Sequence, residues 1–351
     1  MPAHDNAVRL NSLASGHAPH RYRQEELVPL GYEFFSHSFA NFDRMARVYA
    51  NAGIDSRQIS MPLDWYRQPR TFSERNDVYI ECSLAILEEV AARCLDQAGL
   101  EPGEVGGLVV VSSTGLATPT LDALLIDRLR LPPDIRRLPI FGLGCAGGVL
   151  GLARAGAMCR AEPELNVLFL TVELCTLTFQ KDDASKGNVV AAALFGDGAA
   201  GAVLSTSGRG PAVRDWGEHT WPGSLDVMGW DFGEAGEFGV LFSRSIPDIV
   251  RRRFRGAVEG FLQSRDLSLD QIDVYAAHPG GARVLDALEE ALDLPPDALI
   301  HSRETLRRHG NMSAPTALFV LERALQAGAT GRILLTSLGP GFTAAMMLIE
   351  A

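Results

Sequence analysis

The chain has 351 residues, of which 46% are hydrophobic and 21% are charged, and this composition predicts a globular protein with one large domain or two packed halves. The net charge is −11, and so acidic a chain is not expected to bind nucleic acid, which favours basic surfaces. No apolar run reaches the roughly 18 residues that a membrane helix needs, and the N-terminus has no apolar signal-peptide core. We therefore expect a cytoplasmic protein that does not enter the membrane.

Helix-like and strand-like segments alternate along the chain. Apolar residues at helical spacing over 83–100 predict a helix that ends at a glycine. Apolar runs rich in β-branched residues predict buried strands at 105–113 and 166–173, and again at 272–278 and 332–338. This alternation predicts a layered α/β fold.

The two pairs of predicted strands share a spacing. Sixty residues separate Leu108 from Leu168, and sixty separate Asp273 from Ile333. In each interval a polar residue beside glycine opens a helix, 23 or 22 residues before the second strand. The pattern indicates a duplicated half, each copy contributing one helix N-terminus to a shared centre, although two copies alone also allow coincidence.

Five cysteines are spread along the chain without a CxxC pair: Cys82, Cys94, Cys145, Cys159 and Cys175. An odd number at wide spacing disfavours a disulfide framework or a zinc site. The sequence predicts free thiols in a reducing compartment and no bound metal.

Cys145 has the most distinctive surroundings, in FGLGCAGGVL (141–150), where a strand-like run gives way to a helix-like one. The dipole of the following helix is expected to lower the pKa of the thiol, and the glycines let a substrate approach the sulfur. A buried structural cysteine in a glycine-rich turn has the same pattern and is the commoner case for an isolated cysteine. A nucleophilic thiol also needs a base or cation beside it.

Two residues of the second half are candidate partners of Cys145. His278 ends a strand-like run in VYAAHPGG, at the kind of strand end where sites assemble in α/β sheets. Asn311, in HGNMSAPT, is placed either to cap a helix or to donate a hydrogen bond to a developing oxyanion. Each residue alone fits an ordinary structural role. Together, at related places in the two halves, the three predict a catalytic site.

With these segments the chain resembles the type III polyketide synthases, the chalcone synthase-like branch of the thiolase superfamily. The resemblance covers nearly the whole chain through STGLATPTLD, GCAGG, ALFGDGAA, GVLFSRSIP, HPGG, GNMSAPT and SLGPGFT. HPGG together with GNMSAPT is the specific combination, and ATPTLDALLIDRLRL is more similar to the bacterial members. The resemblance implies an α/β thiolase fold of five layers, αβαβα, with an N-terminal half at 1–215 carrying the cysteine and a C-terminal half at 216–351 carrying the histidine and asparagine.

The resemblance also implies an activity for the triad of Cys145, His278 and Asn311. An acyl-CoA starter is loaded on the cysteine, and the other two residues hold the thioester carbonyl of malonyl-CoA while decarboxylation creates the attacking enolate. Repeated extension ends in cyclisation or release as a pyrone, a resorcinol or a related aromatic product. The CoA thioesters are substrates, no cofactor is expected, and the enzyme is expected to be a homodimer. In the resting enzyme, a thiolate–imidazolium pair is one expected state of the cysteine and histidine.

Residues around the triad are assigned by the same resemblance. Phe195 and Phe242 match the gatekeepers between CoA tunnel and cavity, and core packing is the alternative for both. Residues that match the cavity lining are Ser113, Cys175, Thr178 and Gly233, although a structural role suits Cys175 equally well. Thr118 matches the residue that in relatives reaches into the partner's cavity, but it is small and polar here.

CoA contacts are expected at Arg44, Gly280 and Ala314. Plant members use several basic residues near the N-terminal helix to bind CoA phosphates, and Arg44 is the one clearly retained. Other arginines, such as Arg57, are therefore candidates for phosphate recognition, and an acyl carrier protein is an alternative donor.

Two rival functions remain open. A ketoacyl-ACP synthase III-like enzyme would perform a single condensation with the same fold and triad; HPGG and the gatekeeper matches favour the polyketide synthase. A catalytically inactive thiolase-fold subunit would only bind acyl chains or a partner, which the intact triad disfavours. The starter, the number of extensions and the mode of ring closure are not predicted, beyond a preference for an aliphatic acyl-CoA.

Overall fold

The computed structural model describes residues 7–39, 41–233 and 238–351. Its largest sheet has nine strands in the order β11-β12-β13-β8-β1-β7-β6-β4-β5. Their bounds are β1 (Val8–His17), β4 (Gly107–Val111), β5 (Arg136–Ile140), β6 (Val167–Leu174), β7 (Asp197–Ser205), β8 (Ala212–Thr220), β11 (Val274–Ala277), β12 (Arg332–Gly339) and β13 (Thr343–Glu350). The four strands expected from apolar runs are all present, with ends shifted by at most two residues.

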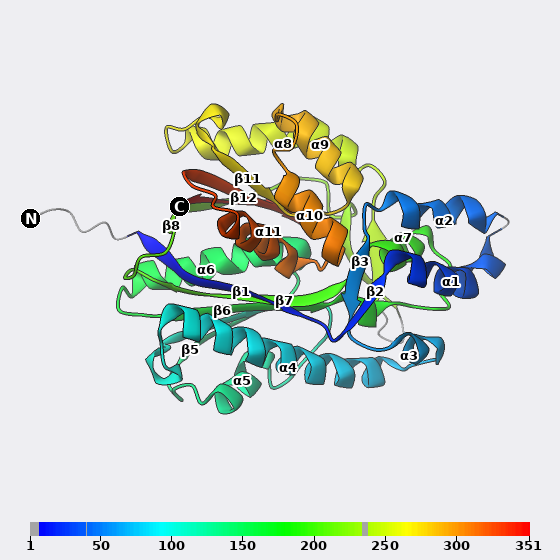
Figure 1. Cartoon of the computed structure of the whole chain (residues 1–351), viewed down its shortest axis with the longest axis horizontal. Helices are drawn as coiled ribbons and strands as arrows, with labels where there is room; N and C mark the ends of the chain where they lie inside the picture. Colours follow the sequence, from blue (N-terminus) through cyan, green and yellow to red (C-terminus); the bar gives the residue numbers. More distant parts are fainter. Residues whose placement is uncertain (1–6, 40, 234–237) are drawn as a thin grey trace, which may run out of the picture.

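The nine-stranded sheet consists of two parts that join at a corner. β1 and β8 pair through Val8 with Val213 and Arg9 with Ala212, whereas β1 pairs with β7 along almost its full length. One part, with β11, β12, β13 and β8, lies above two central helices in Figure 1, and the other part lies below them. The expected boundary between residues 215 and 216 lies within β8, the strand at this corner.

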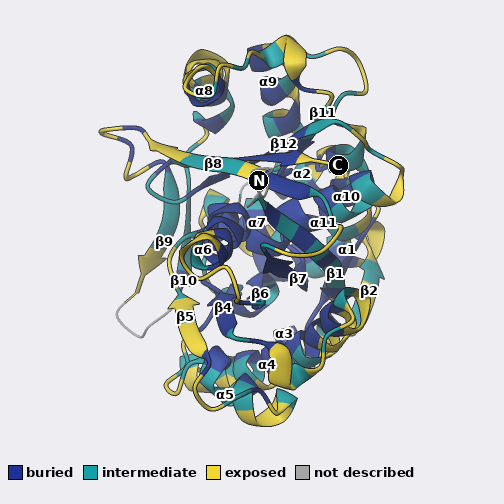
Figure 2. Cartoon of the chain, turned by 90° about the vertical axis from the view of Figure 1, so that its left-hand side faces the viewer, coloured by how far each residue is buried: buried dark blue, intermediate teal, exposed yellow. Residues whose placement is uncertain are grey.

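Helices complete a sandwich of five layers, which confirms the expected αβαβα arrangement (Figure 1). The helices of these layers are α4 (Phe72–Ala98), α5 (Leu121–Leu129), α6 (Gly147–Ala161), α8 (Ile246–Gln263), α9 (Ala282–Leu292), α10 (Ile300–His309) and α11 (Ala314–Gln326). The central pair, α6 and α11, is largely buried, while α4, α5 and α8 expose their outer faces to solvent (Figure 2).

Each half contains the same parallel unit. β4 pairs with β6 so that Leu108 lies opposite Leu168, and β11 pairs with β12 so that Val274 lies opposite Ile333. In both units the helix that precedes the second strand is the central one, α6 or α11. The equal spacing in the sequence therefore corresponds to a repeated structural unit. The residue opposite Ile333 is Val274, one position after the Asp273 from which the spacing was counted.

The helix expected at 83–100 is longer than its apolar pattern indicated. α4 begins at Phe72 because Thr71 and Glu74 form a capping box, each side chain accepting from the other's backbone N–H. It ends at Gly99, which adopts the left-handed conformation that glycine tolerates best. None of the helices in the described ranges is both long and apolar enough to cross a membrane.

A further group of elements packs against one end of the layers, on the right in Figure 1. It contains β2 (His20–Arg23), α1 (Gln24–Phe35), α2 (Phe42–Asn51), β3 (Ser56–Ile59), α3 (Leu63–Arg67) and α7 (Lys186–Leu194). A separate hairpin is formed by β9 (Met228–Phe232) and β10 (Phe238–Phe242). These elements enclose the ends of the central helices, where the predicted site residues lie.

The contact between α6 and α11 depends on Gly148. A Cβ at this position would lie 2.2 Å from the carbonyl oxygen of Ala314, a backbone atom that cannot move independently of its helix. We expect Gly148→Ala to lower the free energy of unfolding by about 1–3 kcal/mol. The measurement is urea denaturation.

Gly256→Ala is the matched control, because it lies inside α8 where an added Cβ meets no described atom within 4 Å. At this position alanine is expected to raise the free energy of unfolding by up to about 1 kcal/mol, since glycine has the poorer helix propensity. Equal effects of the two substitutions would show that the two central helices are not in close contact.

Candidate active site

Cys145 lies in a 3₁₀ turn, η3 (Gly144–Ala146), directly before α6, and is 7% exposed. The turn is held from the first half by Ser113, whose Oγ accepts hydrogen bonds from the backbone N–H of Gly142 (3.1 Å) and Gly144 (3.2 Å). Gly144 has φ +46, and a Cβ there would lie 2.7 Å from Pro340. Ser113, expected to line the cavity, is buried, and its hydroxyl oxygen accepts hydrogen bonds from the nucleophile turn.

The second half supplies β12, which holds both Cys145 and His278. The Ser337 hydroxyl donates to the carbonyl oxygen of Cys145 (2.6 Å), and the His278 backbone N–H donates to that of Thr336 (2.8 Å). His278 follows β11 and is 4% exposed. Neither of its ring nitrogens has a hydrogen-bond partner among the described residues, so the imidazole is free to serve a ligand.

Asn311 and Ser313 complete the surroundings of the thiol. The Asn311 Oδ1 accepts from the Ser313 backbone N–H (2.8 Å), and its Nδ2 donates to the carbonyl oxygen of Gly280 (3.4 Å). Hydrogen bonding from the Ser313 and Asn311 side chains stabilises the thiolate form of Cys145. The structure thus places Asn311 beside the cysteine and ties it to the chain that leaves His278. Asn311 is not the N-cap of α11, a position that Ser313 occupies.

Burial determines the ionisation of both groups. It raises the pKa of the Cys145 thiol to about 11, against the opposing hydrogen bonds from Ser313 and Asn311, and lowers the pKa of the His278 imidazole to about 3. Burial thus shifts the thiol pKa in the direction opposite to the lowering expected from the helix dipole. At neutral pH the resting pair is a thiol and a neutral imidazole, not a thiolate and an imidazolium.

Glu173 is a buried carboxyl group that the sequence analysis missed. It lies in β6, and its Oε2 accepts from the Ser113 backbone N–H (3.0 Å) and the Thr114 hydroxyl (2.8 Å). Burial raises its pKa to about 7, and its charge in turn raises the pKa of Cys145 and of Cys175. The available signal was an acidic residue within an otherwise apolar strand, NVLFLTVE.

The two expected gatekeepers are in contact. Phe195 follows α7 and Phe242 ends β10, and their ring centroids are 5.6 Å apart. Phe195, Cys175 and Thr178 border a small cavity of about 70 Å³. Thr178 also borders a second cavity, of about 810 Å³, whose lining includes Gly233.

The larger cavity combines apolar walls with charged groups. Aromatic side chains of Trp65, Phe72 and Phe238 line it, together with Arg70 and Lys181. Such a space can hold an extended acyl or polyketide chain and present polar groups to its carbonyls.

The expected CoA contacts are dispersed. Arg44 is exposed on α2, and Gly280 is half-buried. Ala314 has no exposed surface and packs against Gly148 of α6. Arg57 is 3% exposed and its guanidinium donates to backbone carbonyls, so it is not available to bind a phosphate. Thr118 is exposed.

Comparison with known proteins matches both halves of the chain. Models of the N-terminal and C-terminal domains of chalcone and stilbene synthases match residues 64–208 and 221–351. A 1,3,6,8-tetrahydroxynaphthalene synthase from Streptomyces peucetius subsp. caesius is 37% identical over 97% of this chain and 93% of its own. A phloroglucinol synthase from Pseudomonas fluorescens is 30% identical over 94% of this chain and 95% of its own.

A solved structure matches the fold at similar coverage. The crystal structure of 1,3,6,8-tetrahydroxynaphthalene synthase from Streptomyces coelicolor A3(2), a bacterial type III polyketide synthase, aligns with a TM-score of 0.93 and 30% identity. The alignment covers 97% of this chain and 99% of that one. The arrangement of layers described above is therefore that of a thiolase-fold polyketide synthase.

Glu173 predicts a pH dependence of stability. Its pKa is about 7 in the folded protein against an ordinary value of 4.5, so folding favours its protonated form and its contribution to stability is lost as the pH rises from 4.5 through 7. The loss amounts to roughly 3 kcal/mol. We expect Glu173→Gln to remove this decline in denaturation experiments at a series of pH values. Glu164→Gln, which changes an exposed carboxylate, should keep the wild-type profile; a wild-type profile in Glu173→Gln would contradict the burial of a titrating carboxyl.

Proposed function

The chain belongs to the chalcone and stilbene synthase family of type III polyketide synthases, and we propose that it loads an acyl-CoA starter on Cys145 and extends it with malonyl-CoA. The observation that carries this proposal is the buried junction at which Asn311 and Ser313 of one half hydrogen-bond Cys145 of the other. Neighbouring residues of β12 hold the backbone of Cys145 and of His278 there, and the His278 imidazole has no partner among the described residues. Such a centre provides a nucleophile, a proton carrier and oxyanion donors in one place.

Loading begins from the neutral pair. As the sulfur of Cys145 attacks the starter thioester, its proton passes to a free ring nitrogen of His278. The carbon–sulfur bond to CoA breaks, and the departing CoA thiolate takes the proton from the imidazolium. The acyl group is then held on the enzyme as a thioester, which preserves its reactivity, and the histidine is neutral again for the next step.

The extension step requires hydrogen-bond donors to the thioester oxygen rather than a general base. When malonyl-CoA loses CO2, the electrons of the broken carbon–carbon bond form an enolate, and negative charge accumulates on the thioester oxygen. The His278 N–H and the Asn311 amide are neutral donors that can face this oxygen in a site from which water is excluded. The enolate carbon attacks the acyl-enzyme carbonyl, and the Cys145 thiolate leaves, stabilised by hydrogen bonding from Ser313 and Asn311.

Multiple extensions are favoured over a single condensation by the volume beside the site. The cavity of about 810 Å³ shares Thr178 with the small cavity that Phe195 borders, and a growing chain would reach this space past Phe195. Its apolar wall suits an aliphatic acyl starter, with release as a pyrone, a resorcinol or a related aromatic product. This volume also disfavours the ketoacyl-ACP synthase III-like alternative.

We further propose a homodimer formed through the surface around Leu116 and Phe141. These large apolar side chains are 48% and 49% exposed, and both border a cavity of about 230 Å³. Thr118 is exposed on the same loop as Leu116, and Phe141 opens the turn that carries Cys145. A second copy covering this surface would bury apolar area and adjoin the nucleophile turn.

The dimer proposal predicts that Phe141→Asp converts a dimer into a monomer, because a charge placed in an apolar contact loses its hydration without gaining a partner. Sedimentation velocity is the measurement. Leu225→Asp is the matched control, since Leu225 is 79% exposed outside this surface and its replacement should leave the mass unchanged. A monomeric wild type, or a dimeric Phe141→Asp variant, would refute the proposed interface.

The activity is tested by incubating the protein with a panel of acyl-CoAs and labelled malonyl-CoA, with products identified by mass spectrometry. We expect products that contain two or more malonyl-derived units. Cys145→Ser should abolish them because a hydroxyl cannot replace the thiol as acyl carrier. Asn311→Ala should lower malonyl-CoA decarboxylation by about 10²–10³-fold, the usual effect of losing one oxyanion donor.

Decarboxylation should survive in Cys145→Ser, because the sulfur is not needed to hold the malonyl thioester oxygen. This retained step separates loss of the nucleophile from loss of the fold. Products with one extension only would support the ketoacyl synthase alternative, and absence of both decarboxylation and products in the wild type would support an inactive acyl-binding subunit.

A further inference from the structure

We propose that Arg57 is a positioning residue that holds the segments carrying Phe195 and Asn311 in a fixed relation, a role whose catalytic consequence rests on the proposed function. Its guanidinium would then fix the position of Phe195, the expected gatekeeper, relative to Asn311, the oxyanion donor. The arginine does not touch the reacting atoms.

Arg57 lies in β3 and is 3% exposed. Its Nη1 donates to the carbonyl oxygen of Phe195 and its Nη2 to that of Ala192, each at 2.5 Å. Both carbonyls belong to the C-terminal end of α7, where backbone oxygens lack partners within the helix and a positive charge complements the helix dipole. A planar guanidinium can satisfy two such oxygens at once, whereas an ammonium group offers a single point of contact.

The end of α7 is joined directly to Asn311. The Asn311 backbone N–H donates to the carbonyl oxygen of Leu194 (2.9 Å), and the Gly196 N–H donates to that of Asn311 (3.0 Å). Phe195 and Asn311 therefore form a short parallel bridge. A displacement of the α7 end that Arg57 holds would be transmitted to the backbone of Asn311 through these two hydrogen bonds.

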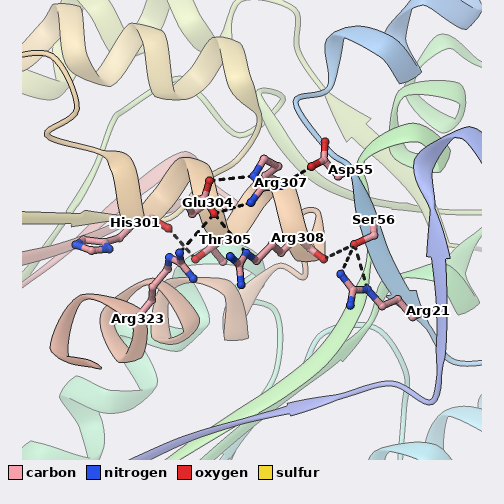
Figure 3. Close-up of polar contacts among 9 residues, drawn as sticks. All are labelled: Arg21, Asp55, Ser56, His301, Glu304, Thr305, Arg307, Arg308 and Arg323. Carbon is pink, nitrogen blue, oxygen red and sulfur yellow. Dashed lines mark hydrogen bonds and ion pairs between the residues drawn. The ribbon is translucent and has the colours of Figure 1, made fainter. Parts of the chain in front are cut away.

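The strand that carries Arg57 is itself anchored to the helix that precedes Asn311. The Asp55 N–H donates to the carbonyl oxygen of Arg307 (2.7 Å), and the Ser56 hydroxyl donates to that of Arg308 (3.1 Å). An ion pair also joins Asp55 to Arg307, and Figure 3 shows these side chains between β3 and the end of α10. β3 thus connects the end of α10 with the end of α7.

The segment around Gly310 and the segment around Gly196 pack so closely that neither can rearrange easily. A Cβ at Gly310, whose φ is +68, would lie 2.8 Å from the Leu194 carbonyl oxygen and 3.5 Å from Arg57 side-chain carbons. A Cβ at Gly196 would lie 2.4 Å from the His309 carbonyl oxygen. Because backbone packs on backbone here, loss of the guanidinium cannot be repaired by movement of neighbouring side chains.

The charge of Arg57 is not explained by an ion pair. None of the salt bridges among the described residues includes it, and its Nε has no hydrogen-bond partner. The nearby Asp197 carboxylate instead accepts hydrogen bonds from the backbone and hydroxyl groups of Ser60 and Thr176. A buried cation without a paired carboxylate is costly, so its hydrogen bonds to the two carbonyls are its main compensation.

The nucleophile is held by different contacts. Ser113 and Ser337, from the two halves, fix the turn of Cys145, and neither lies in β3. Replacement of Arg57 should therefore disturb Asn311, including its hydrogen bond to the thiol, while the backbone of the Cys145 turn stays in place. This separation distinguishes a positioning role from a general contribution to stability.

Hydrogen exchange followed by mass spectrometry tests the positioning without reference to activity. In Arg57→Lys we expect faster exchange in peptides 194–198 and 309–313, which contain the bridging amides, and unchanged exchange in 144–152. Arg303→Lys is the matched control, because it alters an arginine that pairs with surface carboxylates. Arg57→Gln is the second variant, which keeps one donor group and removes the charge.

Kinetics test the consequence for the reaction. We expect Arg57→Lys to lower malonyl-CoA decarboxylation about 10–100-fold, as small misplacements of catalytic groups do, and to leave acylation of Cys145 by the starter within about twofold of wild type. In an Asn311→Ala background, Arg57→Lys should have little further effect on decarboxylation, because the two residues act through one contact.

Several results would overturn the inference: unchanged exchange in both peptides, additive effects of the Arg57 and Asn311 substitutions, or exchange that rises uniformly along the chain. Failure of both the Lys and the Gln variants to fold would likewise assign Arg57 to global stability. If the wild type does not decarboxylate malonyl-CoA, the proposed function fails, and hydrogen exchange still decides whether Arg57 positions the segment.

Discussion

Burial of the site residues at the junction between the two halves is the constraint on which the rest of this site depends. It keeps the Cys145 thiol and the His278 imidazole neutral, since the charged form of either would be poorly solvated. A neutral imidazole can accept the thiol proton during loading and donate a hydrogen bond during decarboxylation. The low dielectric constant of a buried site also strengthens every hydrogen bond to a developing oxyanion. Burial is therefore the largest influence on the pKa of the nucleophile.

The closed centre is stable because both halves hold it. Ser113, after β4, accepts from the amides of the nucleophile turn, and Ser337, in β12, donates to the carbonyl oxygen of Cys145. Gly148 brings α6 against α11, so the two helices that begin at the site also form its base. The duplicated unit thus provides two similar scaffolds whose helix N-termini meet, with the nucleophile on one and the amide on the other.

The sequence was sufficient to predict the strands, the layers and the convergence of the site residues. Apolar runs located β4, β6, β11 and β12 because buried parallel strands need continuous hydrophobic sequence. The matched spacing of Cys145 and Asn311 before β6 and β12 predicted that they approach each other, and the contacts of Ser313 and Asn311 with the thiol agree. Assignment of catalytic roles to these residues stays a prediction until activity is measured.

What the sequence could not supply depends on contacts between distant segments. The thiol pKa depends on how completely Pro340 and β12 enclose the turn, which no local pattern specifies. Glu173 becomes important through the amide of Ser113 and the hydroxyl of Thr114, about 60 positions away. Arg57 was a candidate for phosphate recognition, yet its partners are carbonyls more than 130 positions along the chain.

Titration of the thiolate by ultraviolet absorbance, taken as the difference between wild type and Cys145→Ser, tests the neutral resting state most directly. The account predicts that the difference signal appears only in alkaline solution, with a midpoint near pH 11. A signal already present at neutral pH, and lost when His278 is replaced by Gln, would demonstrate a thiolate–imidazolium pair and contradict the dominance of burial at this site.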